Sequence, residues 1–218
     1  MIAIVENDTD IADGSFVDAI VRYLPDAAVF DVVRNSDLPS LIDVDALVLA
    51  GSRAGVYESD DYGWIREEAA LVREAAHRGI PILGICFGHQ LVHSAFGGRV
   101  EEGRTRHQLI QATLGDDPLF VDMKPVVPVL HGDYVVEPAA GFETIATADY
   151  YEPLATRHAT RPIWTVQFHP EYGPQLTHLI DEWTETEWSF DDCNSSVLFE
   201  KFNQIVTRYW DGRRRRID

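Results

Sequence analysis

The sequence predicts an α/β fold: an open, mostly parallel sheet with helices on both faces and a smaller antiparallel β extension. In the first part of the chain, short apolar runs alternate with helical stretches, and this order implies parallel strands joined by right-handed crossovers. The run 46–50, Ala-Leu-Val-Leu-Ala, is apolar throughout, as expected of a strand covered on both faces. From residue 126 onward, short strands are separated by turn residues, which indicates the antiparallel extension.

The individual elements follow from apolar spacing and from stop signals. In the first part we expect strands at 2–5, 28–33, 46–50 and 82–85, and helices at 14–24, 64–78 and 88–96. The last of these helices ends at Gly97-Gly98, which is a usual stop. In the second part we expect strands at 126–130, 143–148, 154–157 and 163–168, and closing helices near 175–184 and 196–210.

Length and composition favour one domain over the whole chain, residues 1–218. A single core can grow to this size, and hydrophobic residues make up 45% of the chain, which is enough to fill such a core. The acidic stretch 185–195, between the closing helices, is expected to be a loop insertion. Four consecutive arginines at 213–216 mark 211–218 as a solvated Arg-rich tail.

The charge balance disfavours two classes of partner. The net charge of −18 disfavours binding to nucleic acid and to anionic membranes. The acidic residues are spread along the whole chain, and this favours adaptation to high salt in a halophilic host over one acidic docking face.

The N-terminus indicates, by default, a cytoplasmic protein. Residues 1–6 have no basic stretch before their short apolar run, so they are typical of a first strand and not of a signal peptide. No apolar run approaches the roughly 20 residues that a membrane span needs. In the cytoplasm, Cys86 and Cys193 are expected to be free thiols.

Cys86 lies in the segment 81–90, Pro-Ile-Leu-Gly-Ile-Cys-Phe-Gly-His-Gln. A buried strand runs directly into a helix here, with glycines two residues before and after the cysteine, which is the pattern of a nucleophile elbow. The sulfur would project from the carboxyl end of the sheet, at a helix N-terminus that favours the thiolate. A small buried apolar residue is the alternative for a lone cysteine, but the glycines favour the nucleophile. Cys193 has no such context.

His169 is the best candidate for the base that such a thiol needs. It follows the expected strand 163–168, so it too lies at a strand end, and Pro170 keeps the next residues extended. Residues two apart on an extended chain point the same way, so Glu171 can orient the imidazole. On this segment alone, a strand-end histidine bonded to backbone is an equal alternative. Together with the cysteine elbow, the catalytic interpretation is favoured.

His89 and His93 are four residues apart on one helix face, which is a spacing found in metal sites. The zinc-protease pattern requires a glutamate directly after the first histidine, where this chain has Gln90. The sequence also offers no third ligand. We therefore expect no metal site.

Two segments together resemble a known family. Residues 84–90, Gly-Ile-Cys-Phe-Gly-His-Gln, and residues 167–171, Gln-Phe-His-Pro-Glu, resemble the class I (triad) glutamine amidotransferases, and the pattern is similar to the glutaminase domain of GMP synthases. The run 49–52 looks like the family's oxyanion strand, and 131–133, His-Gly-Asp, looks like its substrate-side loop. The family often has Ser-Gly-Gly-Pro where this chain has Ala-Gly-Ser-Arg at 50–53. The resemblance implies a flavodoxin-like sheet.

The resemblance implies a role for each matching residue. Cys86 attacks the glutamine carboxamide, and His169, oriented by Glu171, protonates the leaving ammonia. The oxyanion is held by the backbone N–H of Phe87 and by one from the turn Gly51-Ser52. A γ-glutamyl thioester remains until water, activated by the imidazole, releases glutamate, and no cofactor is needed. Four further residues are implied to grip the glutamine: Gln90, Gly132, Asp133 and Tyr134.

The sequence leaves open what receives the ammonia. In this family ammonia usually passes to a synthetase, and the chain has no phosphate-binding Gly-Lys-Ser/Thr loop, so a separate synthetase subunit is the expected acceptor. A hydrolase of γ-glutamyl compounds, which can share the fold and the thioester chemistry, is the alternative. An inactive glutamine-binding regulatory module is a third hypothesis, and the complete triad argues against it.

Overall fold

The computed structural model describes residues 1–9, 16–180 and 182–215. The parallel strands are β1 (Ile2–Glu6), β2 (Ala28–Asp31), β3 (Ala46–Leu49), β4 (Ile82–Ile85) and β10 (Ile163–Val166). The remaining strands are β5 (Arg99–Gln111), β6 (Thr113–Leu114), β7 (Val126–Glu137), β8 (Phe142–Ala148) and β9 (Tyr151–His158). The α-helices are α1 (Phe16–Tyr23), α2 (Val32–Asn35), α3 (Trp64–Arg78), α4 (Phe87–Ala95) and α5 (Val197–Arg214). The short 3₁₀ helices are η1 (Pro118–Phe120), η2 (Pro174–Leu179) and η3 (Phe190–Asp192).

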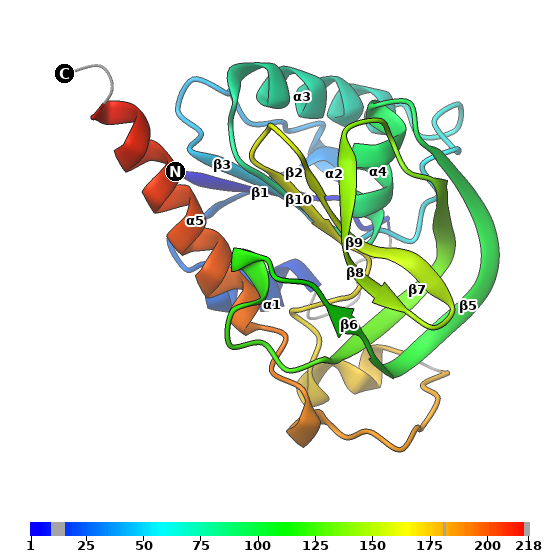
Figure 1. Ribbon diagram of the computed structural model, residues 1–218. Helices are drawn as coiled ribbons and strands as arrows, with labels where there is room; N and C mark the ends of the chain where they lie inside the picture. Colours follow the sequence, from blue (N-terminus) through cyan, green and yellow to red (C-terminus); the bar gives the residue numbers. More distant parts are fainter. Residues whose placement is uncertain (10–15, 181, 216–218) are drawn as a thin grey trace.

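The described residues form an eight-stranded sheet with the strand order β2-β1-β3-β4-β10-β9-β8-β6, and β5 pairs with β7 in a separate ribbon (Figure 1). The pairings from β2 to β10 are parallel, and those from β10 to β6 are antiparallel. The predicted α/β fold, with a mostly parallel sheet and an antiparallel extension, is confirmed. All five parallel strands therefore end at one carboxyl edge.

Helices cover both faces of the parallel strands, because alternate residues of each strand point to opposite sides. In β3, Ala46 and Val48 pack in one core with side chains of α1 and α5, whereas Leu47 and Leu49 pack in another with those of α3 and α4. Figure 1 shows α5 on one side of the sheet and α3 on the other. The continuous apolar run 46–50 thus reflects burial on both faces.

The strand expected at 28–33 ends earlier, at Asp31. The Asp31 carboxylate accepts a hydrogen bond from the backbone N–H of Arg34 at 2.9 Å and so caps the short helix α2. Val32 is therefore a buried helical residue. The apolar pair Val32-Val33 is compatible with a strand or with a helix, and the cap at Asp31 favours the helix.

The helix expected near 175–184 is wrong, because the described part of this segment contains only the 3₁₀ helix η2. The Trp183 ring stacks with the rings of Tyr172 and Phe190, with centroids 5.1 and 5.8 Å away. The backbone N–H of Thr184 donates to the carbonyl of His107 in β5 at 2.7 Å. Contacts with distant parts of the chain therefore outweigh the local helical pattern.

Strand β5 was not predicted, and β7 extends beyond the expected 126–130. The first half of β5 carries arginine and glutamate side chains without apolar alternation and is largely exposed. It is a strand because its backbone pairs with β7, from Arg99 opposite Glu137 to Gln111 opposite Val126. Local apolar spacing contains no signal for such a pairing.

The acidic segment 185–195 has little regular structure, as predicted for a loop, and η3 is its one helical turn among the described residues. The end of this segment is hydrogen-bonded to the residues that precede β7. The backbone N–H of Lys124 donates to Oδ1 of Asn194 at 2.6 Å, and Nδ2 of Asn194 donates to the carbonyl of Asp122 at 2.9 Å. That this loop is an insertion stays a prediction.

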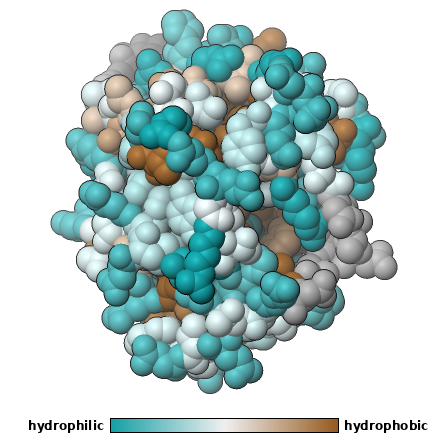
Figure 2. Space-filling model, turned by 90° about the vertical axis from the view of Figure 1, so that its right-hand side faces the viewer, coloured by the Kyte–Doolittle hydropathy of each residue, from teal (hydrophilic) through white to brown (hydrophobic). Residues whose placement is uncertain are grey.

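Helix α5 continues to Arg214, so residues 211–214 of the expected Arg-rich tail are helical. Residues 216–218 of that tail lie outside the described residues. Although α5 is long, charged residues such as Glu200 and Arg208 are exposed on it, and none of the described helices has the length and apolar character needed to cross a membrane. Figure 2 shows that hydrophilic side chains cover most of one face of the molecule, with small separate hydrophobic areas between them.

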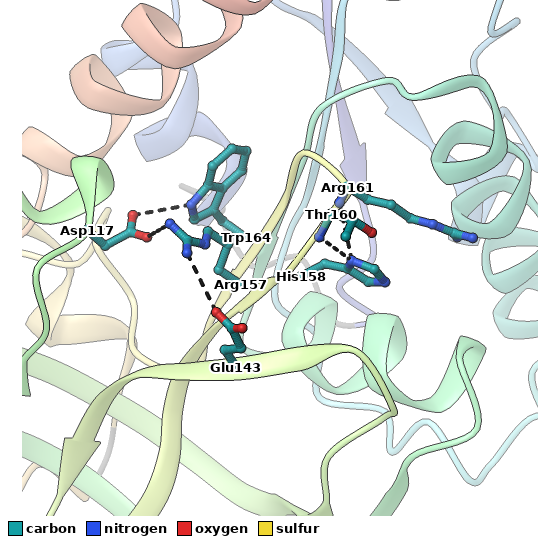
Figure 3. A network of polar contacts seen from close by, with 7 residues as sticks. All are labelled: Asp117, Glu143, Arg157, His158, Thr160, Arg161 and Trp164. Carbon is teal, nitrogen blue, oxygen red and sulfur yellow. Dashed lines mark hydrogen bonds and ion pairs between the residues drawn. The ribbon is translucent and has the colours of Figure 1, made fainter.

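A buried carboxylate joins the antiparallel end of the sheet to η1. Asp117 is 4% exposed, and its Oδ1 accepts hydrogen bonds from the backbone N–H of Leu119 at 2.9 Å and from Nε1 of Trp164 at 3.2 Å. Its Oδ2 accepts from Arg157 at 3.0 Å, and Arg157 also reaches Glu143 on β8 (Figure 3). One carboxylate therefore connects η1 with β9 and β10.

We predict that Asp117→Ala lowers the free energy of unfolding by about 2–4 kcal/mol, because Trp164 and Arg157 lose a buried acceptor. Urea unfolding followed by tryptophan fluorescence measures the change. Asp116 is exposed, so Asp116→Ala is the matched control and should change the stability by less than about 0.5 kcal/mol. Similar losses in both variants would contradict the assigned role of Asp117.

Candidate active site

Cys86 lies at the junction of β4 and α4, on the carboxyl edge of the parallel strands. Its backbone has φ 52° and ψ −105°, a conformation that residues other than glycine rarely adopt. A Cβ added at Gly84 would lie 2.5 Å from the carbonyl oxygen of Gly88, and one added at Gly88 would lie 2.4 Å from the carbonyl oxygen of Leu49. Both glycines are therefore required by close backbone contact, and the chain makes the elbow that its sequence predicts.

His169 and Glu171 form a buried hydrogen-bonded pair beside the sulfur. Nδ1 of His169 lies 2.6 Å from Oε1 of Glu171, and the two residues are 4% and 0% exposed. Cys86 lies close enough to the imidazole to help raise the pKa of His169, and its Sγ donates a hydrogen bond to the carbonyl of Leu130 at 3.5 Å. The backbone N–H of His169 donates to the carbonyl of Pro128 in β7 at 2.9 Å. The ring of Phe16 contacts the imidazole in a tilted arrangement, with ring centroids 5.3 Å apart.

The surroundings of His169 favour its charged form. Burial by itself lowers the pKa of His169, but Glu171 and Cys86 together raise that pKa well above its ordinary value. A positively charged imidazolium next to a thiol stabilises the thiolate, which is the reactive form of cysteine. The arrangement is therefore suited to nucleophilic attack by Cys86.

The turn Gly51-Ser52 follows β3 and contacts both His169 and Cys86. A Cβ added at Gly51 would lie 2.9 Å from Cε1 of His169 and 3.7 Å from Cβ of Cys86, so a larger residue does not fit there. Oγ of Ser52 accepts a hydrogen bond from the N–H two residues further on, at 3.0 Å, and so shapes the turn. Phe87 is the first residue of α4, and its N–H has no acceptor within the helix. The turn and the first N–H of α4 thus both adjoin Cys86, and their role as an oxyanion hole stays a prediction.

The predicted substrate-side loop is brought to the sulfur. Gln90, Gly132 and Asp133 line one cavity together with it. Nε2 of Gln90 donates to the carbonyl of Asp133 at 3.3 Å and to Oε1 of Gln167 at 3.2 Å. Tyr134 is not among the residues that line this cavity, and its hydroxyl donates to a backbone carbonyl of β5 at 2.5 Å. The side chain of Tyr134 therefore supports the ribbon.

Cys86 lies between two cavities, of about 460 and about 530 Å³. The smaller cavity is bounded by the substrate-side loop and by the carboxyl groups of Glu58 and Glu102. The larger cavity is bounded by Phe16 and His169, among others. Among the described residues, His169 borders the larger cavity and not the smaller one. The imidazole therefore borders one cavity and the substrate-side loop borders the other, with Cys86 on both.

Several residues near the sulfur were missed by sequence reasoning. His107, for which the sequence offers no pattern, borders both cavities, and burial lowers its pKa. Asp8 and Arg53 form an ion pair at 3.2 Å beside the larger cavity. Glu68 of α3 is fully buried and accepts a hydrogen bond from Asn7 at 3.1 Å. A glutamate at an apolar position of the helical repeat is the signal that could have found it.

His89 and His93 lie in the core among hydroxyl groups. Nδ1 of His89 is 2.7 Å from Oγ1 of Thr165, and Nε2 of His93 is 3.0 Å from Oγ1 of Thr156. Burial lowers the pKa of both rings, that of His93 to about 4, so both are neutral and join α4 to β9 and β10. The described residues contain no group of three or more side chains placed to hold a metal ion.

Comparison with known proteins assigns the chain to a family. The family model "Glutamine amidotransferase class-I" matches residues 10–182. The chain belongs to this family. The prediction of a class I glutamine amidotransferase, made from the cysteine elbow and the Gln-Phe-His-Pro-Glu segment, is confirmed.

The amidotransferase is similar to GMP synthases. It is 34% identical over 151 residues to a subunit of the glutamine-hydrolysing GMP synthase of Halobacterium salinarum, a match that covers 67% of this chain and 76% of that subunit. It is 32% identical over 165 residues to the GMP synthase of Pyrobaculum aerophilum, where the match covers 72% of this chain and 31% of that longer protein. A solved structure, a putative GMP synthase subunit from Thermoplasma acidophilum, matches with a TM-score of 0.73 at 22% identity, over 98% of this chain and 96% of that one. This likeness supports the fold.

We predict that Gly51→Ala lowers the turnover of glutamine by about 100-fold, because the new methyl group displaces the imidazole and disturbs the oxyanion turn. Glutamate release measures turnover, and circular dichroism checks the fold. The matched control is Gly63→Ala, since nothing lies within 4 Å of a Cβ at Gly63. Wild-type turnover in Gly51→Ala would show that the turn is not part of the site.

Proposed function

We propose that this amidotransferase hydrolyses the side-chain amide of glutamine through a γ-glutamyl thioester on Cys86. The observation that carries the proposal is the convergence of three side chains at one edge of the sheet: Glu171 contacts His169 at 2.6 Å, and the position of Gly51 adjoins both His169 and Cys86. Membership of the family supports glutamine as the substrate.

In the first half-reaction, the thiolate of Cys86 attacks the carboxamide carbon of a glutamine held in the smaller cavity. The N–H of Phe87 and one from the turn Gly51-Ser52 stabilise the oxyanion. As the C–N bond breaks, His169 transfers its proton from Nε2 to the leaving nitrogen. Ammonia departs on the side of the larger cavity, and the γ-glutamyl group stays on the sulfur as a thioester.

In the second half-reaction, neutral His169 takes a proton from a water molecule on its side of the sulfur. The resulting hydroxide attacks the thioester carbon, the C–S bond breaks, and the sulfur leaves as thiolate beside the imidazolium. Glutamate is released and the starting state is restored. Throughout, Glu171 holds the imidazole by the 2.6 Å contact to Nδ1 and stabilises its charged form.

We predict that His169→Ala lowers kcat by about 1,000-fold or more, since the proton carrier is lost. Glu171→Gln should lower kcat less, because the carboxylate orients the imidazole and does not itself carry the proton. Glu171→Gln should also lower the pKa of His169, because a charge that raises this pKa is removed. Steady-state kinetics and an NMR titration of the imidazole measure the two effects. Equal losses of kcat in both folded variants would contradict this division of roles.

We further propose that the ammonia passes to a separate synthetase subunit, in the manner of a GMP synthase. The similarity to a subunit of the Halobacterium salinarum enzyme supports this assignment. The larger cavity, on the side from which ammonia departs, is the region that such an acceptor would have to reach.

A hydrolase of γ-glutamyl compounds is the second candidate function. It is favoured by the size of the larger cavity, about 530 Å³, because a molecule the size of water or ammonia takes up only about 30 Å³. A substituent on the amide nitrogen would therefore have room beside His169. An inactive glutamine-binding module is disfavoured, because it has no use for the strained backbone of Cys86 or for the buried imidazole–carboxylate pair.

Glutamate release from glutamine and from γ-glutamyl amines, measured at high salt, distinguishes these functions. We expect glutamine to be the better substrate, with stimulation by the acceptor synthetase and its substrates, and Cys86→Ala to be inactive. A preference for γ-glutamyl amines would establish the second function. Inactivity of the wild type on all substrates, with candidate synthetases present, would favour the binding module.

We also propose that the enzyme works in the cytoplasm of a halophilic host. The net charge of −18, from carboxylates distributed along the chain, supports the second point, because dissolved salt screens the repulsion between them.

A further inference from the structure

Glu68 is a carboxyl group in an apolar position. It lies on the buried face of α3, one turn from Trp64 and one turn from Val72, and is 0% exposed. Its side chain accepts a hydrogen bond from Asn7, which follows β1 and is also 0% exposed. A charge at this position would be buried away from water, with no charged side chain of the described residues contributing to its pKa.

Asn7 connects this carboxyl group to the oxyanion turn. Its Nδ2 donates to the carbonyl oxygen of Ala50 at 3.2 Å and to Oε1 of Glu68 at 3.1 Å. Two acceptors face the same atom, so that atom must be the amide nitrogen, and the orientation of the side chain is fixed. Ala50 directly precedes Gly51, and its carbonyl also accepts from the N–H of Gly88 at 3.2 Å. Asn7 therefore bonds to the point where β3, the oxyanion turn and the Cys86 elbow meet.

The two side chains leave two acceptors without a donor. Oδ1 of Asn7 and Oε2 of Glu68 are both buried and have no hydrogen-bond partner among the described residues. Buried polar atoms are almost always paired, so a donor is required at this position. A proton on Glu68 would supply it, because a neutral carboxylic acid beside a carboxamide can donate one hydrogen bond and accept another.

The electrostatic surroundings agree with a protonated acid. Burial raises the pKa of Glu68 to about 8, and the hydrogen bond from Asn7 lowers it only in part. No charged side chain of the described residues contributes to this shift.

We propose that Glu68 is a neutral positioning residue, which through Asn7 holds the carbonyl of Ala50 and so sets the Gly51-Ser52 turn for stabilising the oxyanion. This role rests on the proposed function of Cys86. Ionisation of Glu68 would place an unpaired charge behind the turn and remove the donor available to Oδ1 of Asn7.

The test compares Glu68→Gln and Glu68→Ala with the wild type, in glutamine hydrolysis from pH 6 to pH 9.5. Glutamine reproduces the donor and acceptor of a neutral glutamic acid, whereas alanine removes both. We expect Glu68→Ala to lower kcat at least about 10-fold with little change in KM, as for a weakened oxyanion donor, and Glu68→Gln to restore it. The fall of wild-type kcat near pH 8 should be absent in Glu68→Gln. Glu67→Gln, at the exposed neighbouring position, is the matched control and should behave as the wild type.

A second readout does not depend on activity. Burial raises the pKa of Glu68 from 4.5 to about 8 in the folded protein. The contribution of Glu68 to the free energy of folding is therefore fully present below pH 4.5 and is lost as the pH rises to about 8. The melting temperature of the wild type should therefore fall relative to that of Glu68→Gln over this pH range. A constant difference, or equal loss of kcat in Glu68→Gln and Glu68→Ala, would overturn the proposal. If the enzyme hydrolyses no glutamine but the melting temperatures diverge as expected, the protonation is supported and the function of Cys86 is what fails.

Discussion

The contact on which the site depends is the approach of the start of α4 to the end of β3. At Gly88 the helix backbone comes so close to the carbonyl of Leu49 that no side chain fits between them. In the same place the N–H of Gly88 donates to the carbonyl of Ala50. This contact sets the separation between the Cys86 elbow and the Gly51-Ser52 turn, which in our proposal lets the sulfur and the oxyanion donors act on one carbonyl group. The strained backbone of Cys86 is maintained because the packed strands and helix around it leave no alternative.

Two buried carboxyl groups connected to this site have different neighbours. Glu171 faces the imidazole of His169, which can carry the matching positive charge at 2.6 Å. Glu68 faces the carboxamide of Asn7, which cannot carry one. In our proposal, Glu171 supports a charged imidazole beside the sulfur, whereas Glu68 is a hydrogen-bond donor behind the Gly51-Ser52 turn.

Sequence reasoning succeeded where all the information lies within one segment. The predicted bounds of α3 and β4 are those of the structure, because each is an uninterrupted periodic or apolar run with its own stop signals. The segment 175–184 failed for the opposite reason, since stacking of Trp183 and a backbone bond to β5 outweigh its helical spacing. A glutamate at an apolar helix position could have drawn attention to Glu68. The sequence could not identify Asn7 as its hydrogen-bond partner, because the two residues are far apart in the chain.

By itself, the sequence determined the class of fold and the elbow, and it predicted the nucleophile, base and orienting acid, because alternation of strands and helices brings Cys86 and His169 to the same edge of a parallel sheet. Only the tertiary structure decided which groups surround them. The ribbon of β5 and β7, the two cavities on either side of the sulfur and the support of the oxyanion turn all arise from contacts between segments far apart in the chain. Such contacts depend on shape and on hydrogen-bond geometry in three dimensions, and periodicity along a sequence carries no information about either.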